Sequence, residues 1–264
     1  MLRSVKVDRI SIALHQSTGL TLAAAFDTVI GVAVDSTGVT YVCDYYNHKI
    51  VTISAGGTVG LLVGQSGVPT YAEGTGTGAR FSFPVNVVVD PTDTVLVVAD
   101  REHHMVRKVT IGTSTSTLIA GDGIAGFVDG PGVNARFNQP HGLALAPVGI
   151  TFASDETNHA IRKIASDNSV TTLAGTGALG FANDVGALAS FSGPRGIAFD
   201  SSGYLYVAEE GNDCVRLVDT ATGLVSTLAT TLGASPIGIA VKPDASAIWV
   251  VDSSDNTVKC FSAA

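Results

Sequence analysis

Short apolar runs, each interrupted by polar turn residues, recur along the whole chain. Both faces of these runs are apolar or small, as expected for strands that pack between neighbouring sheets. No segment keeps an apolar period of 3.6 residues, so the pattern predicts strands and almost no helix. Five of the runs open similar units: Gly31–Asp35, Asn86–Asp90, Gly142–Ala146, Gly196–Asp200 and Gly238–Lys242.

Each unit continues in the same order. A second strand ends in an acidic residue, which we call the anchor, and a short turn leads into a third strand. The first four units then add a fourth strand, for example Val170–Ala174. Four short strands in a unit of about 40 to 55 residues are typical of a propeller blade. The anchors are Asp44, Asp100, Asp155, Glu209 and Asp252.

The motifs of these units resemble the NHL repeat of β-propellers. The third unit carries the segment from Asp155 to Lys163 (Asp-Glu-Thr-Asn-His-Ala-Ile-Arg-Lys). Its fourth strand, further along, reads Val-Thr-Thr-Leu-Ala-Gly. The fourth unit opens with Pro-Arg-Gly-Ile-Ala. The connectors 78–84, 134–140 and 188–194 also match that family. The resemblance covers residues 20–264 and implies a propeller fold. It implies no single activity, because members of the family include interaction modules, RNA binders and a few enzymes.

We therefore predict an all-β fold, a single β-propeller over residues 1–264. Five four-stranded blades are expected, with six as the alternative. The last unit ends after three strands, so a strand from the N-terminus is expected to close the ring. Residues 20–24 match the fourth-strand pattern, which leaves a surplus strand within residues 1–19. The repeats are expected at 30–64, 85–121, 141–175, 195–229 and 237–262.

Charge and composition narrow the classes of partner. The net charge is −8, and only 14% of the 264 residues are charged. A phosphate-binding surface needs clustered positive charge, so we expect no nucleic-acid partner, although Arg80, Arg136 and Arg195 are candidate exposed cations. No apolar run reaches the roughly 18 residues of a membrane span. The three cysteines are expected to be free thiols. Free thiols and the absence of a visible signal peptide favour a cytoplasmic location. We also expect a monomer.

The turn after each second strand and the connector that enters the next unit are expected on one face. This face would carry His48, His103, His104, His141 and His159. We expect the anchors to cap backbone N–H groups and the connector phenylalanines to fill gaps between blades. The cations of the third strands are expected to pair with carboxylates; these are Lys49, Arg107, Arg162, Arg216 and Lys259.

The candidate ligand-binding residues are Asn86, His141 and Arg195, at the expected mouth of the central channel. His48, His104 and His159 lie on turns that are separated by packed sheets, about 10 Å apart, and so cannot share a zinc ion. The chain has no Gly-x-Ser-x-Gly elbow and no His-Glu-x-x-His motif. We expect a non-catalytic binding or interaction scaffold for a protein, peptide or small ligand, without a cofactor. The alternative is a propeller hydrolase or lyase with a divalent metal in the channel.

Overall fold

The computed structural model describes residues 3–6, 26–229 and 235–262. The chain divides into two compact units, each described by itself. The large unit contains residues 120–264 together with 1–8, and the small unit contains residues 9–119. The described residues form strands and short 3-10 turns and contain no α-helix.

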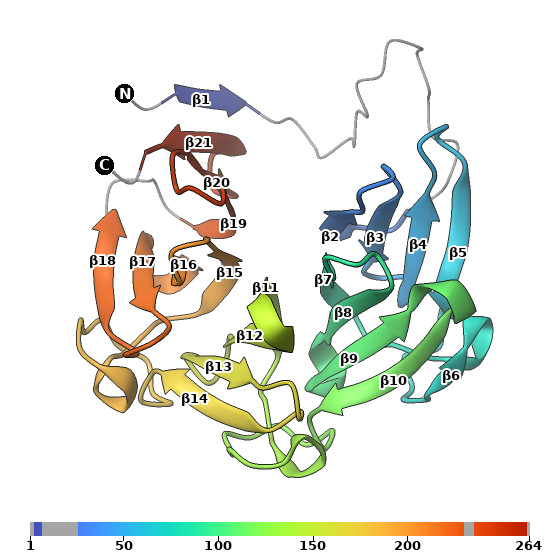
Figure 1. Cartoon of the computed structure of the whole chain (residues 1–264), viewed down its shortest axis with the longest axis horizontal. Coiled ribbons are helices and arrows are strands. Elements are labelled where there is room, and N and C mark those ends of the chain that lie inside the picture. The colour runs from blue at the N-terminus through green and yellow to red at the C-terminus, as the bar shows by residue number, and fades with distance from the viewer. Residues whose placement is uncertain (1–2, 7–25, 230–234, 263–264) are drawn as a thin grey trace. The chain divides into compact units, whose positions relative to one another are not determined.

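The small unit contains two sheets, drawn in blue to green in Figure 1. Their strands run in sequence order, and a short β6 lies outside β10. Blade A consists of β2 (Val29–Val34), β3 (Thr40–Asp44), β4 (Lys49–Ile53) and β5 (Val59–Gly64). Blade B consists of β7 (Pro84–Val89), β8 (Val95–Asp100), β9 (Met105–Thr110), β10 (Thr115–Ala120) and β6 (Gly74–Thr75), with the 3-10 turns η1 (Gly76–Gly78), η2 (Arg101–His103) and η3 (Ile111–Thr113).

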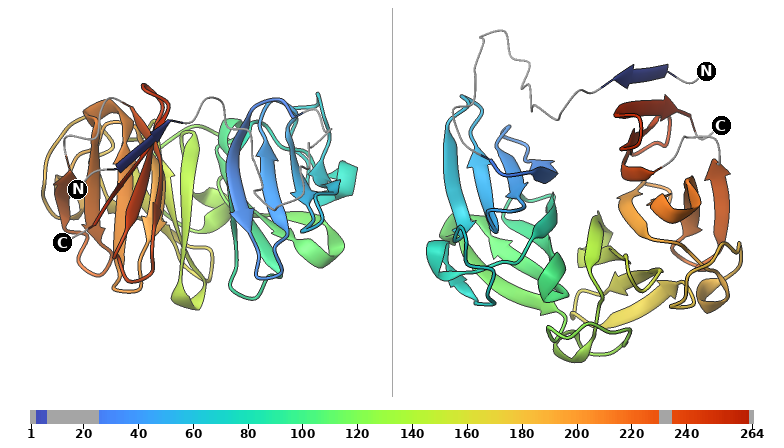
Figure 2. Two further views of the ribbon diagram at one scale, coloured as in Figure 1. Left: turned by 90° about the horizontal axis from the view of Figure 1, so that it is seen from above. Right: turned by 180° about the vertical axis from the view of Figure 1, so that it is seen from behind.

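The large unit contains three sheets, which Figure 2 shows from two further sides. Blade C consists of β11 (Pro140–Ala146), β12 (Ile150–Asp155), β13 (Ala160–Ile164) and β14 (Val170–Ala174). Blade D consists of β15 (Pro194–Phe199), β16 (Tyr204–Glu209), β17 (Cys214–Asp219) and β18 (Val225–Ala229). Blade E consists of β19 (Pro236–Val241), β20 (Ile248–Asp252), β21 (Thr257–Phe261) and β1 (Arg3–Lys6). The 3-10 turns are η4 (Gly132–Asn134), η5 (Pro147–Gly149), η6 (Gly186–Leu188) and η7 (Glu210–Asn212).

Blade E is completed from the N-terminus. β1 pairs antiparallel with β21, with Val5 opposite Val258, so it takes the place of a fourth strand (Figure 1). Completion by an N-terminal strand agrees with the sequence analysis. This strand, β1, lies within residues 1–19, where the sequence analysis placed a surplus strand. The closing strand that was expected at residues 20–24 lies outside the described residues.

The described residues thus form five blades of four antiparallel strands, which confirms the all-β propeller class and the count of five. Neighbouring blades share cores within each unit. In the small unit, Phe81 is fully buried among side chains of blades A and B. In the large unit, Phe191 is fully buried among side chains of blades C and D. The connector phenylalanines therefore fill the space between blades, as the sequence predicted.

The first strands of neighbouring blades approach at backbone distance. A Cβ atom on Gly142 would lie 2.1 Å from the Arg195 carbonyl oxygen. On Gly196 it would lie 2.8 Å from the Cα atom of Gly238. No side chain fits at either position, which explains the glycine in the Pro-x-Gly pattern.

Candidate functional site

Each anchor is tied to the cation of the third strand in its own blade. The guanidinium of Arg162 lies 2.7 Å from Asp155, and that of Arg216 lies 3.0 Å from Glu209. The corresponding pairs in blades A, B and E are Lys49–Asp44, Arg107–Asp100 and Lys259–Asp252. Asp155 also accepts the backbone N–H of Asn138 at 2.7 Å. The predicted capping and pairing roles are confirmed, and they occupy these groups structurally.

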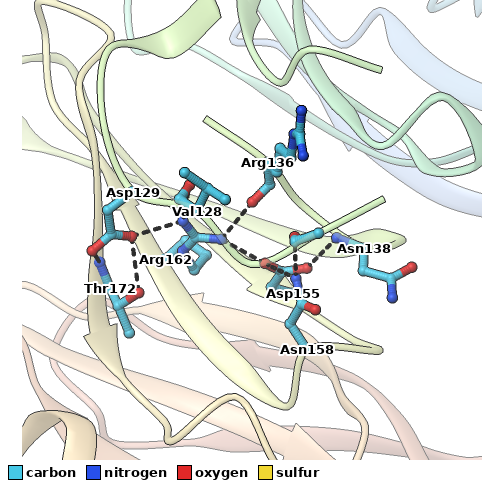
Figure 3. Close-up of polar contacts among 9 residues, drawn as sticks. Val128, Asp129, Arg136, Asn138, Asp155, Asn158, Arg162 and Thr172 are labelled. Atoms are coloured by element: carbon cyan, nitrogen blue, oxygen red, sulfur yellow. Dashed lines mark hydrogen bonds and ion pairs between the residues drawn. The ribbon is translucent and has the colours of Figure 1, made fainter. Parts of the chain in front are cut away.

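Figure 3 shows how the buried Arg162 also holds the preceding connector. It donates to the carbonyl oxygens of Arg136 and Val128, each at 2.8 Å, and to the Asp129 carboxylate at 2.7 Å. Asp129 in turn accepts the backbone N–H of Thr172 at 2.9 Å, in the fourth strand. The connector is therefore fixed to its blade by one guanidinium, which is not available to a ligand.

Each of the three buried arginines also lies between two aromatic rings. The guanidinium carbon of Arg162 lies 4.9 Å from the ring centre of Phe127 and 5.0 Å from that of Phe137. Arg107 lies over Tyr71 and Phe81, and Arg216 over Phe181 and Phe191. Sequence reasoning missed the first ring of each pair. An aromatic residue ten positions before each connector phenylalanine was the available signal.

The last residue of the turn after the second strand links neighbouring blades. His48 Nδ1 accepts the backbone N–H of Phe83, and His159 Nδ1 accepts that of Gly193, both at 3.1 Å. Asp213 occupies the same position in blade D and accepts the backbone N–H of Ser235 at 2.8 Å. Burial lowers the pKa of both His48 and His159, so the neutral acceptor form is favoured. These histidines are parts of the scaffold.

His141 and Arg195 lie at β-bulges, where one extra residue enters the first strand of blades C and D. The Arg195 guanidinium, 27% exposed, lies 3.1 Å from Glu156 and 2.8 Å from Glu210. The strands β11 and β15 contact each other, so the structure brings His141 and Arg195 onto neighbouring strands. Sequence reasoning missed the two glutamates as partners of Arg195.

Asn86 lies in the small unit, in β7, one position later in its blade than His141 and Arg195 in theirs. The blade A strand approaches it closely: a Cβ atom on Gly31 would lie 2.6 Å from the Asn86 Cα atom. Its side chain is half-buried, and its Oδ1 atom is buried without a hydrogen-bond partner. The three candidate residues thus divide between the two units.

No metal cluster is present in the described part of the chain, and two of its thiols are buried. No group of three or more His, Cys, Asp or Glu side chains there could hold a metal ion. Cys43 and Cys214 are buried, and burial raises the pKa of both thiols, to about 12 for Cys214. None of the helices in the described residues is long and apolar enough to cross a membrane.

The two positions that follow each anchor carry side chains that vary among the blades, although their backbone N–H groups make repeated contacts. From blade A to blade E these pairs are Tyr45-Tyr46, Arg101-Glu102, Glu156-Thr157, Glu210-Gly211 and Ser253-Ser254. The turns lie beside the connectors: the Glu102 N–H donates to the Ser82 carbonyl oxygen, and the Thr157 N–H to that of Asn138, both at 3.1 Å.

No protein-family model matches the chain. Over 124 residues, 46% of its length, the chain is 35% identical to NHL repeat-containing protein 2 of Gallus gallus, and over 125 residues it is 34% identical to the Homo sapiens protein of that name. The names of these relatives agree with the five blades and the motifs. Together they support the NHL-repeat propeller family.

The chain is also 31% identical, over 159 residues, to Protein SUPPRESSOR OF QUENCHING 1, chloroplastic, of Arabidopsis thaliana. That match covers 57% of this chain and 15% of the Arabidopsis protein. The match to the human protein covers 17% of that protein. The chain therefore spans under a fifth of the length of these curated relatives.

Solved structures of diverse proteins share the fold. A nidogen/laminin complex matches with a TM-score of 0.67 at 15% identity, covering 89% of this chain and 76% of the other. A gluconolactonase from Xanthomonas campestris matches with a TM-score of 0.64 at 16% identity, covering 92% and 78%. A streptogramin B lyase matches with a TM-score of 0.58 at 12% identity, covering 98% and 72%. At these identities the likeness shows the fold alone.

Proposed function

We propose that this NHL-repeat propeller is a non-catalytic scaffold that binds a protein, peptide or small ligand on the connector side of its blades. One observation carries the proposal. The repeated anchors, third-strand cations and turn histidines are occupied by scaffold contacts, whereas the side chains at the two positions after each anchor vary among the blades. A rigid framework that displays varied side chains on its loops is suited to recognition.

The cluster around Arg195 is the candidate contact region of the large unit. Arg195, Glu156 and Glu210 form a partly exposed group of one cation and two carboxylates, with His141 on the adjacent strand. Partly exposed charges of this kind steer a partner and set its orientation. Asn86 is the corresponding candidate of the small unit. The structure of nidogen in complex with laminin supports the proposal, because it is a complex of two proteins.

The alternative is a hydrolase or lyase with a divalent metal in the channel. The gluconolactonase and lyase structures favour this class through the shared fold. Metal analysis of the freshly purified protein is its direct test. A divalent ion bound stoichiometrically, whose removal abolishes a hydrolytic or elimination activity, would establish the enzyme and overturn the scaffold.

The binding proposal is tested by selecting short random peptides on the wild-type protein. Binding of the selected peptides is then measured for the variants Arg195→Glu and His141→Ala. The matched control is Asp167→Lys, an exposed charge change in the turn between β13 and β14. We expect the first two variants to weaken binding by about tenfold or more and the control to retain it. Equal binding by all three variants would contradict the proposal.

A further inference from the structure

Comparison of the blades with one another isolates an aromatic group that the fold does not require. Blade A carries Tyr45 and Tyr46 at the two turn positions that follow its anchor, where the other blades carry charged, small or hydroxyl residues. The connector from blade A to blade B places Phe83 before its proline. The same position holds Gln139, Gly193 and Ser235 in the later connectors. The blades form with any of these residues, so the fold does not require rings at the three positions.

The three rings form one cluster in the small unit, which we call the aromatic patch. The ring centre of Tyr45 lies 5.0 Å from those of Tyr46 and Phe83, and the Tyr46 and Phe83 centres are 5.7 Å apart. Tyr46 is 52% exposed. Other aromatic side chains of the chain are also exposed, but aromatic residues that cluster in this way are enriched at binding hot spots.

Backbone hydrogen bonds and the His48 ring hold the aromatic patch in place. The Tyr45 N–H donates to the Thr28 carbonyl oxygen at 3.0 Å, and the Tyr46 N–H to that of Asp27 at 3.1 Å. The His48 ring packs edge to face on Phe83 at 4.5 Å while its Nδ1 accepts the Phe83 N–H. A preorganised patch loses little side-chain entropy when a partner binds.

The backbone gives no reason for an aromatic residue at position 83. Phe83 has a φ angle of +54°, the left-handed conformation that bulky side chains rarely adopt. Glycine fills the same position in the connector from blade C to blade D, where strain is absent. Gln139 and Ser235 adopt the same left-handed conformation at this position, so the connectors impose it on whichever residue they carry there. The connector from blade A to blade B meets this requirement with a ring.

The charge around the aromatic patch is negative. Asp27 is exposed and lies directly beside Tyr46, and Glu102 is part of the turn that bonds the connector next to Phe83. Arg101 forms a hydrogen bond with Tyr45 and lies 2.5 Å from Glu102, which matches its charge. Residues 26–119 contain eight acidic and five basic residues, a net charge of −3, and the whole chain carries −8. Tyrosine and phenylalanine rings beside carboxylates attract ammonium and guanidinium groups.

We propose that the aromatic patch of Tyr45, Tyr46 and Phe83 docks a lysine- or arginine-bearing peptide segment of a partner protein. The cationic side chain lies over the exposed Tyr46 ring, and Asp27 complements its charge. This inference rests on the proposed scaffold function and names the class of partner for the small unit. The same negative charge opposes the phosphate backbone of a nucleic acid.

The test uses the full chain and short random peptides displayed on phage. Peptides are selected on the wild-type protein, and their binding is then measured for the variant Tyr46→Ser/Phe83→Ser. Both substitutions introduce residues that blade E carries at these positions, Ser254 and Ser235, and an unchanged thermal melt verifies folding. The matched control is Leu179→Ser/Leu188→Ser, which removes two exposed apolar side chains from the large unit. Tyr46→Phe restores a ring without the hydroxyl group.

We expect the selected peptides to contain lysine or arginine. Their affinity should fall by about tenfold or more for Tyr46→Ser/Phe83→Ser and remain within about twofold for the leucine control and for Tyr46→Phe. Replacing the basic residue of a peptide by glutamine should cause a similar loss, and binding should weaken as salt is added.

Four outcomes would overturn the inference. Selection could yield no peptides, or peptides without basic residues. Peptides with basic residues could bind the serine variant as well as the wild type. A single-stranded oligouridine probe could bind instead and depend on Tyr46, which would assign the patch to nucleic acid. In the third case, peptides that bind the serine variant but not Arg195→Glu would still support the proposed scaffold function, so the two failures are distinguishable.

Discussion

Arg162 and Asp155 form an ion pair with both side chains fully buried, 2.7 Å apart, at the point where the connector meets blade C. The pair fixes two segments of the chain at once, because Asp155 caps the Asn138 N–H while Arg162 binds two connector carbonyl oxygens. The position of the connector on blade C therefore depends on the ion pair between Arg162 and Asp155.

Arg162→Ala should strongly destabilise the large unit. The substitution leaves the Asp155 carboxylate buried without its cation, and the expected loss is about 3 to 5 kcal/mol in the free energy of unfolding. Urea denaturation measures the loss. The matched control is Arg136→Ala, whose partly exposed pair with Asp122 is worth about 1 kcal/mol or less. Equal losses for the two variants would contradict the structural role of Arg162.

Gly142→Ala should also destabilise the large unit, through backbone contact. The new Cβ atom would lie 2.1 Å from the Arg195 carbonyl oxygen, so β11 and β15 must separate. We expect a loss of about 1 to 3 kcal/mol in thermal or urea unfolding. Gly112→Ala is the control, because nothing lies within 4 Å of its Cβ position. A Gly142→Ala protein as stable as this control would show that the two strands are further apart.

The turn histidines should make stability depend on pH. Burial lowers the folded-state pKa of His48 and His159 below the ordinary value of 6.5. As the pH falls below about 6.5, the unfolded chain binds protons that the folded chain does not, so the free energy of unfolding decreases. Their contribution is complete above the unfolded pKa and is lost as the pH falls through the folded pKa.

The measurement compares the wild type with His48→Asn/His159→Asn by urea denaturation between about pH 7.5 and pH 5. Asparagine tolerates the left-handed conformation of these turns, where φ is +56° and +50°. The variant should lose less stability than the wild type over this range. Parallel pH curves for the two proteins would assign the acid sensitivity to other groups.

The N-terminal strand should protect blade E. β1 covers the free edge of β21, and an uncovered edge strand presents unpaired backbone groups to other chains. Val5→Pro removes one backbone donor opposite Val258 and should lower the unfolding temperature and increase aggregation. Light scattering during a thermal melt reports both effects. The control is Asn168→Gly, in the turn before β14. A proline at position 201 is unsuitable as a control, because the Ser201 N–H donates to the Pro243 carbonyl oxygen. A Val5→Pro protein that behaves as this control would show that β1 does not stabilise the blade.

The sequence by itself determined the class of fold, because each blade repeats the same short sequence motifs. The alternation of short apolar runs with turn residues, the Pro-x-Gly openings and the acidic anchors are all readable one unit at a time. Their spacing specified five four-stranded blades and placed Asp155 near Arg162 correctly, since both lie in one blade. The capping role of the anchors followed from side-chain chemistry that acts over a few residues.

Only the tertiary structure decided which groups meet between blades. Glu156 and Glu210 converge on Arg195 from turns that the sequence separates widely, and Tyr45 and Tyr46 meet Phe83 across two blades. The strand that completes blade E was also decided this way, because several short N-terminal segments match the same strand pattern. Contacts of this kind depend on how sheets pack, and packing leaves no periodic signal in the chain.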